Sequence, residues 1–277
     1  MVKLRVSEPG DRSALKRLWE LAFGDEGAYI EHFFACYFTP ERMLVLEQDG
    51  QVRAMTAWFD MPLVSAAGER MPAAYLYAVA THPDGRGQGF AGRLLDFAGQ
   101  WLGERGFACL TTVPARPDLH MFFEKNGFSE GFVLSRKDYE RPPQNPGVSL
   151  APVDGTEYGV LRESRLAGTP HVAYAPEGLA YQQGVCALSG GGLYRVGQDG
   201  CACVEVTSEQ VFVKELLTDD PEGAVSAIAA NYPGRHLQVR VPWTGQGERW
   251  DFAMLRPLAP MPRWDGDGTA YLGLAFD

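Results

Sequence analysis

The spacing of apolar positions in the first half of the chain predicts alternating strands and helices. Three runs with apolar residues every three to four positions predict amphipathic helices at residues 11–23, 28–37 and 88–104. Alternating or continuous apolar runs predict strands at residues 4–6, 43–47, 52–59, 73–81, 108–112 and 128–134. Asp49-Gly50 is a hairpin signal between two of these strands. The strand at 108–112 follows a crossover helix, so we expect it to lie parallel to the strand at 73–81.

Residues 141–147 interrupt this pattern, and three prolines and a glycine within seven residues are typical of a linker. Beyond them we expect helices at 157–166, 176–188 and 222–230, and strands at 148–151, 192–196, 201–206, 210–217, 236–241, 251–255 and 270–276. This order weakly repeats that of the first half. We therefore expect two α/β domains, at residues 1–140 and 148–277.

Composition narrows the class of protein. A hydrophobic content of 45% in 277 residues supplies enough apolar surface for real cores. No apolar run approaches the length of a membrane span, and the N-terminus lacks the apolar core of a signal peptide. An odd count of five cysteines then favours a reducing cytoplasm. The five histidines show no metal-ligand spacing, so we expect no metal.

The net charge of −10 disfavours nucleic acid as a partner, because binding it requires a basic face. Residues 149–277 carry −7 of this charge. An acidic half would attract a cationic small molecule, although carboxylates that only solvate the surface would give the same composition. The sequence leaves self-assembly into a homo-oligomer open.

A glycine-rich segment between the strand at 73–81 and the helix at 88–104 carries the candidate chemistry. It reads Arg86-Gly87-Gln88-Gly89-Phe90-Ala91. A turn of this kind at a helix N-terminus directs main-chain N–H groups at one point, which suits a phosphate or pyrophosphate. An ordinary tight turn is the simplest alternative. Dinucleotide, Walker and kinase loops fit poorly, because the acidic residue, the Gly-Lys-Ser/Thr triplet and the following Val-Ala-Ile-Lys strand that they need are missing.

The flanks of this segment resemble the acetyl-CoA-binding motif of the GNAT superfamily of N-acetyltransferases. Arg86, Gly89 and Ala91 occupy the defined positions of R/Q-x-x-G-x-G/A, and Phe122-Phe123-Glu124-Lys125-Asn126-Gly127-Phe128 resembles a second GNAT segment, F-Y-x-K-x-G-F. The resemblance covers about residues 1–140. Within GNAT proteins the layout is similar to the enhanced-intracellular-survival type, which acetylates amines such as aminoglycosides.

The resemblance implies a mixed α/β fold with a central, largely antiparallel sheet, followed by a degenerate second GNAT-like domain. It also implies acetyl-CoA as co-substrate and no metal. The implied cofactor-binding residues lie on the strand, in the loop and on the later helix: Val79, Thr81, Arg86, Gly87, Gln88, Gly89, Phe90, Ala91 and Phe123. The second half has Asp219-Asp220-Pro221 where its loop would be, and these carboxylates would repel a phosphate.

The residues at the positions of the family's acid and base differ from those that the family uses. Phe123 stands where the family has the tyrosine that protonates the thiolate, so we consider Tyr75 and Tyr77, which share one face of a strand, as the acid. Core packing would explain both tyrosines as well, and His120 is a weaker candidate. The strand at 73–81 lacks the usual glutamate base. In the enhanced-intracellular-survival type the terminal carboxylate is the base, which points to Asp277.

We expect the acceptor to lie by the first helix–helix turn, where Asp25, Glu26 and Glu31 could hold a cation or merely form a solvated face. The sequence therefore predicts a cytoplasmic acetyl-CoA-dependent N-acetyltransferase acting on a primary amine of a small, cationic molecule. Two alternatives remain: a non-catalytic acyl-CoA-binding or regulatory module, and an acetyltransferase for protein or peptide amines.

Overall fold

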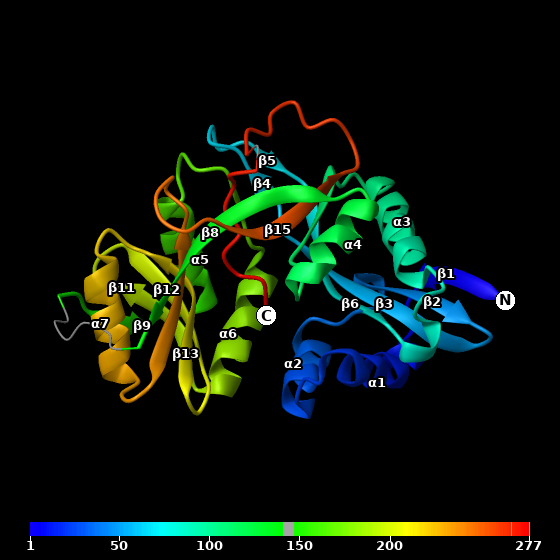
Figure 1. The fold of residues 1–277 in the computed structure, drawn as a ribbon, viewed down its shortest axis with the longest axis horizontal. Coiled ribbons are helices and arrows are strands. Elements are labelled where there is room, and N and C mark those ends of the chain that lie inside the picture. The colour runs from blue at the N-terminus through cyan, green and yellow to red at the C-terminus, as the bar shows by residue number, and fades with distance from the viewer. Residues whose placement is uncertain (141–146, 267, 277) are drawn as a thin grey trace. The chain divides into compact units, whose positions relative to one another are not determined.

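The structure is a computed structural model that describes residues 1–140, 147–266 and 268–276. The chain divides into two compact units, shown in Figure 1. Unit 1 comprises Met1–Pro62, Met71–Glu130 and Ala253–Pro262, and unit 2 comprises Leu63–Arg70, Gly131–Phe252 and Arg263–Asp277. Most of the predicted linker, residues 141–146, lies outside the described residues.

A mixed sheet forms the centre of unit 1. Its strands follow the order β1 (Val2–Val6), β2 (Met43–Gln48), β3 (Gln51–Asp60), β6 (Ala73–Thr81), β7 (Cys109–Thr112) and β15 (Trp250–Pro257). All neighbours are antiparallel except β6 and β7, which are parallel as the crossover rule predicts. The Asp49-Gly50 turn joins β2 to β3, and both of its residues have positive φ.

Helices cover both faces of this sheet. Helices α1 (Arg12–Phe23) and α2 (Gly27–Cys36) lie on one side, and helices α3 (Phe90–Gly103) and α4 (His120–Lys125) lie on the other (Figure 1). Strand alternation explains the division, because Trp58 packs against Trp101 of α3 while Phe59 packs against Phe33 of α2. Leu15, Leu18 and Trp19 form the buried stripe of α1 that the periodicity predicts, and Gly24 ends the helix in the left-handed conformation.

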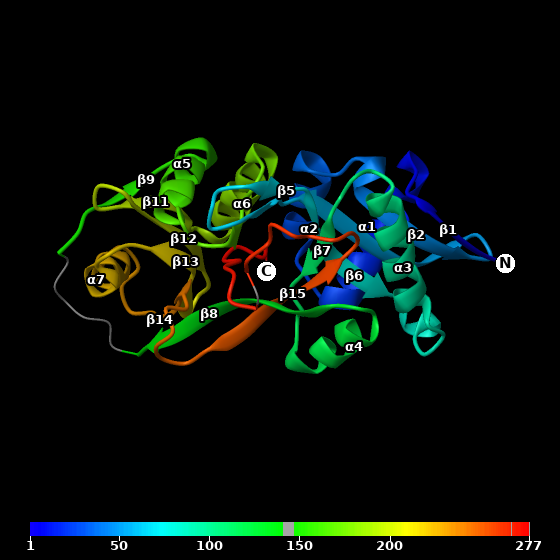
Figure 2. The same cartoon turned by 90° about the horizontal axis from the view of Figure 1, so that it is seen from above.

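Unit 2 repeats the sheet topology of unit 1. Its order is β9 (Leu150–Pro152), β11 (Gly192–Val196), β12 (Gly200–Val206), β13 (Gln210–Leu217), β14 (His236–Pro242) and β8 (Ser129–Tyr139). Again the fourth and fifth strands are parallel and the other neighbours antiparallel. The helices are α5 (Gly155–Arg165), α6 (Pro176–Ser189) and α7 (Pro221–Asn231), and α7 is seen end-on in Figure 2.

Each sheet is completed by a strand from a distant part of the chain. The strand that follows α4, β8, pairs with β14 in unit 2, whereas the last long strand, β15, pairs with β7 in unit 1. A short second sheet joins β10 (His171–Val172), β4 (Leu63–Val64) and β5 (Arg70–Met71). In the described part of the chain, no helix is long and apolar enough to cross a membrane.

The predicted strand at 270–276 is wrong. Only two isolated bridges form there, Phe132 with Ala270 and His171 with Tyr271. Beyond them a side chain takes over the main-chain hydrogen bonding, because the Tyr174 hydroxyl donates to Leu274 O (2.6 Å) and accepts from Leu274 N (2.9 Å). The apolar pattern of this segment therefore reflects burial in unit 2 rather than a strand ladder.

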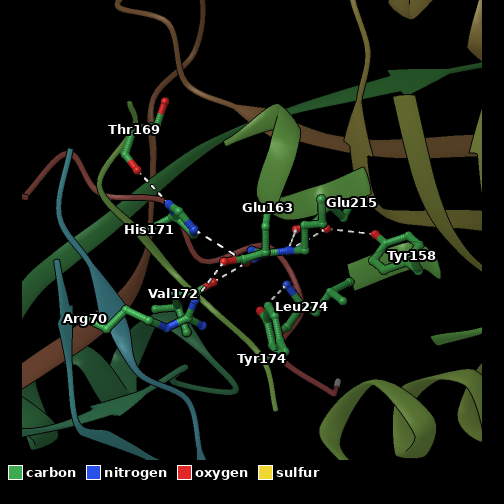
Figure 3. A network of polar contacts seen from close by, with 10 residues as sticks. Arg70, Tyr158, Glu163, Thr169, His171, Val172, Tyr174, Glu215 and Leu274 are labelled. Atoms are coloured by element: carbon green, nitrogen blue, oxygen red, sulfur yellow. Dashed lines mark hydrogen bonds and ion pairs between the residues drawn. The ribbon is translucent and has the colours of Figure 1, made fainter. Parts of the chain in front are cut away.

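A buried ion pair lies beneath this segment in unit 2 (Figure 3). Arg162 of α5 donates through Nε to Glu215 Oε2 of β13 at 2.9 Å, and both residues are fully buried. Tyr158 donates to the same carboxylate at 2.7 Å, and Arg162 Nη1 donates to Val172 O at 2.7 Å. Although burial opposes its charge, the Glu215 carboxylate raises the pKa of Arg162. A Cβ on Gly273 would lie 2.1 Å from Glu215 Oε1, so the segment needs glycine there.

We expect Arg162→Met to lower the free energy of unfolding by about 3–5 kcal/mol, because it leaves the Glu215 charge buried without its cation. Arg165→Met is the matched control on the same helix: its partner Asp219 is 86% exposed, so the expected loss is under about 1 kcal/mol. Urea titration of both variants measures the difference. Equal losses would contradict the account of the buried pair.

Candidate functional site

The loop between β6 and α3 is shaped by two left-handed glycines. A short 3-10 turn, Pro83–Gly85, follows β6, and then Gly87 (φ 74°) and Gly89 (φ 72°) turn the chain into α3. Gly89 is the N-cap of α3. A Cβ at either glycine would meet no atom within 4 Å, so these glycines are required by their backbone conformation rather than by crowding.

Main-chain amides at this loop are left without protein acceptors. Among the described residues, no carbonyl or side chain accepts from the nitrogens of residues 87–92; the first amide with a partner is that of Arg93, which donates to Gly89 O at 3.1 Å. The first N–H groups of a helix have no intrahelical partner, and the helix dipole adds positive charge at the same end. The loop therefore presents consecutive donors suited to an anion with several oxygens, such as a pyrophosphate.

Close packing fixes the loop against the rest of unit 1. A Cβ on Gly85 would lie 3.0 Å from the Phe90 ring, and one on Gly92 would lie 2.8 Å from Asn126 Oδ1. Phe90 and Phe123 belong to the same buried cluster. The segment around Phe123 thus holds the start of α3, and Phe123 itself is 4% exposed.

Strands β6 and β7 part in front of the loop. Their parallel pairing covers only Ala73 to Tyr75 of β6 and ends at the Tyr75–Thr111 pair. Ala78 then has φ 51°, where β6 makes a bulge against β3. Val79 and Thr81 lie beyond the parting and are partly exposed. The main chain of β6 is therefore available on the β7 side to an extended ligand.

A threonine hydroxyl bridges the parted strands. Thr112 Oγ1 of β7 donates to Leu76 O of β6 at 3.2 Å, and this side-chain bond replaces a ladder bond that the parting removes. On the β3 side, Thr56 Oγ1 lies within hydrogen-bonding distance of two carbonyls, Ala57 O at 3.0 Å and Tyr77 O at 3.2 Å.

Tyr75 and Tyr77 project from β6 towards α1 and α2, with ring centroids 6.2 Å apart. Tyr75 is 2% exposed, whereas Tyr77 is partly exposed. The Tyr77 hydroxyl forms a hydrogen bond with the hydroxyl of Tyr29 on α2. The Tyr77 ring packs against the aromatic rings of Trp19, Phe33 and Phe59.

Three of the other candidates, His120, Asp25 and Glu31, have partners within unit 1. His120 Nδ1 lies 2.6 Å from Glu130 Oε1. Asp25 accepts from Trp19 Nε1 at 2.7 Å, and Glu31 forms an ion pair with Lys16. Glu26 is exposed at the N-cap of α2, and Arg86 is exposed in the loop. Asp277 lies outside the described residues.

Tyr29 and the bulge at Ala78 are absent from the sequence-based predictions. Tyr29 is one of many aromatic residues on α1 and α2, and its pairing with Tyr77 joins positions 48 residues apart. The apolar pattern does not reveal the bulge. The residue type does not reveal it either, because alanine rarely adopts a positive φ. Both features arise only from the register between elements.

Comparison with known proteins agrees with the fold. Residues 3–130 match the profile of a family described as an acetyltransferase (GNAT) domain. No protein among curated sequences matches the chain. Residues 3–130 therefore form a GNAT acetyltransferase domain.

Solved structures resemble nearly the whole chain. A GCN5-related N-acetyltransferase from Kribbella flavida superimposes with a TM-score of 0.71 at 14% identity, over 93% of this chain and 71% of that one. Eis1 from Mycobacterium abscessus gives 0.66 at 13% identity, over 92% and 74%. A putative acetyltransferase from Pyrococcus horikoshii gives 0.62 at 13% identity, over 98% and 94%. At these identities the likeness establishes the mixed α/β fold.

We expect Gly89→Val to abolish the thermal shift that acetyl-CoA produces, because valine resists the left-handed conformation that opens the amides to the ligand. Gly50→Val in the β2–β3 turn is the control: Gly50 has φ 79° and open space around it, so the backbone strain is similar. Differential scanning fluorimetry with and without acetyl-CoA compares the two. A full acetyl-CoA shift in folded Gly89→Val contradicts the assignment of the loop.

Proposed function

We propose that the chain transfers the acetyl group of acetyl-CoA to a primary amine of a small, cationic acceptor. The observation that carries the proposal is the run of amides at residues 87–92 without protein acceptors, beside the parted β6. In this proposal the pyrophosphate binds to these amides, and the extended remainder of the cofactor would follow the main chain of β6 beyond Tyr75.

The proposed cofactor-binding residues fall into groups by role. The pyrophosphate receives main-chain hydrogen bonds from Gly87, Gln88, Gly89, Phe90 and Ala91. The exposed side chain of Arg86 adds a charged donor. Val79 and Thr81 supply main-chain contacts to the pantetheine. Phe123 contributes packing only, because phenylalanine has no proton to give.

Charge supports a cationic acceptor. Asp25 and Glu26 stand at the turn between α1 and α2. Carboxylates attract an ammonium group. Glu31 contributes less, since Lys16 neutralises it. The attacking amine must lose a proton, and Asp277 stays the proposed base.

The five free cysteines support a reducing compartment such as the cytoplasm as the place of action. Three of the four buried thiols, Cys109, Cys201 and Cys203, have pKa values raised by burial, so they stay protonated and unreactive. None of the described histidine, cysteine or acidic side chains gather into a metal-binding group.

We expect release of free thiol from acetyl-CoA to depend on added amine. Aminoglycosides, polyamines and an N-terminally free peptide form the panel, with a thiol reagent as readout and mass spectrometry of the product. Acetyl-CoA at about 100 times its dissociation constant should also stabilise the fold by about 2.7 kcal/mol. Stabilisation without turnover on any amine favours the non-catalytic binding module, which the loss of the family's tyrosine at Phe123 would permit. Turnover on peptides alone moves the acceptor to protein amines.

We expect Glu26→Gln to raise KM for a cationic acceptor several-fold while kcat stays unchanged, because the carboxylate attracts the ammonium before reaction. Glu104→Gln, at the far end of α3, is the control and should leave KM unchanged. Added salt should weaken the difference between wild type and Glu26→Gln. An unchanged KM in Glu26→Gln removes this carboxylate from the acceptor site.

A further inference from the structure

Two exposed cations of unit 1 lie by the first turn of α3, where the loop presents its open amides: Arg93 of α3 and Lys125 of α4. Coenzyme A carries a phosphate on the 3′-oxygen of the same ribose whose 5′-oxygen bears the pyrophosphate. We propose that Arg93 and Lys125 form a second anion subsite, which binds this 3′-phosphate and selects coenzyme A over its dephospho form. This inference rests on the proposed binding of acetyl-CoA and deepens it.

These cations differ from most others in the chain because no protein group neutralises them. Among the residues that the structure describes, most arginine and lysine side chains form an ion pair, a hydrogen bond or a ring contact. The exceptions are Lys3, Arg17, Arg86, Arg93 and Lys125. Three of these five belong to the loop or to the helices that meet beside it. In a chain with a net charge of −10, such a gathering of unpaired cations marks a place for an external anion.

Arg93 is held within reach of an anion on the loop. Its amide donates to Gly89 O at 3.1 Å and so closes the first turn of α3. The four residues from Gly89 to Arg93 advance about 6 Å along the helix axis. Because the Cα–Cβ bonds of a helix tilt towards its N-terminus, the long side chain of Arg93 starts in the direction of the loop.

Lys125 is brought to the same turn by contact between α3 and the end of α4. A Cβ added to Gly92 would lie 2.8 Å from Asn126 Oδ1, so the two segments meet there. Asn126 is itself fixed, because its Nδ2 donates to Phe122 O at 2.7 Å. Lys125 directly precedes Asn126 and is exposed in the last turn of α4. Its flexible side chain therefore begins beside the first turn of α3.

The carboxylates of these elements leave the positive charge in place. Asp84 before the loop and Asp96 on α3 each form an ion pair with an arginine, at 3.6 Å and 3.0 Å. Glu124 is exposed next to Lys125. It stands two positions before Asn126, however, and two helical positions correspond to about 200° around the axis. Glu124 therefore lies on the side of α4 that faces away from the contact with α3.

A phosphate monoester matches two cations supplied by two helices. It carries close to two negative charges near neutral pH and has three acceptor oxygens. A guanidinium and an ammonium group both donate charge-assisted hydrogen bonds to such oxygens. Since both side chains are exposed, each attraction is modest and weakens with added salt. The structure therefore favours a moderate selectivity for the 3′-phosphate over an absolute requirement for it.

The test measures the dissociation constants of coenzyme A and dephospho-coenzyme A, which lacks only the 3′-phosphate, by isothermal titration calorimetry at low ionic strength. Wild type should bind coenzyme A about tenfold more tightly than the dephospho form. The double variant Arg93→Gln/Lys125→Gln should lose this preference, with about tenfold weaker binding of coenzyme A and unchanged binding of the dephospho form. Added salt should reduce the preference of wild type. Thermal unfolding without ligand should be unchanged, because both side chains are exposed and unpaired.

Lys3→Gln/Arg17→Gln is the matched control, because it removes the same charge from exposed, unpaired positions on β1 and α1. It should keep the tenfold preference. Equal affinity of wild type for the two nucleotides overturns the inference, as does an unchanged preference in Arg93→Gln/Lys125→Gln. Equal loss of the preference in the control also overturns it, since long-range attraction would then explain the selectivity. In these cases coenzyme A still binds to wild type, whereas binding of neither nucleotide is the failure of the proposed function itself.

Discussion

The parting of β6 from β7 is the constraint on which the rest of the site depends. Two parallel strands normally continue their ladder, and main-chain groups left unpaired in an interior are costly. Here the bulge at Ala78 redirects β6, and the Thr112 hydroxyl satisfies the carbonyl of Leu76. The opening is therefore a stable part of the fold. The loop with Gly87 and Gly89 follows directly and presents its amides at the end of the same strand.

The two units show how one topology can leave the N-terminus of a helix open or cap it. In unit 2 the strand β13 also leaves its parallel partner, after Val213. The following helix, however, is capped by Asp220, whose Oδ1 accepts from Gly223 N at 2.9 Å. A carboxylate thus takes the donors that a phosphate would need, and it would repel one. Next to the parted stretch, Glu215 is neutralised by Arg162 and covered by the segment around Gly273. In unit 2 the corresponding place is therefore filled by packed protein groups.

Much of the fold could be predicted from local pattern, since helices with one apolar stripe and the Asp49-Gly50 hairpin depend on nearby residues. The glycine loop was predictable for the same reason, because Gly87 and Gly89 supply the conformations that it needs. Long-range choices were not predictable. The apolar pattern of residues 270–276 marks burial but cannot reveal that Tyr174 replaces a strand partner. Likewise, no periodicity reveals that β8 and β15 complete sheets far from their neighbours in sequence, or that Tyr29 meets Tyr77.

Hydrogen exchange of the loop amides tests the central claim most directly. The account predicts that coenzyme A slows exchange at residues 87–92 and along β6 beyond Tyr75, because the ligand takes the hydrogen bonds that the protein leaves open. Exchange at the corresponding loop of unit 2, around Asp220, should stay unchanged. Saturating coenzyme A with no added protection at residues 87–92 would contradict the account, since the ligand would then be bound elsewhere.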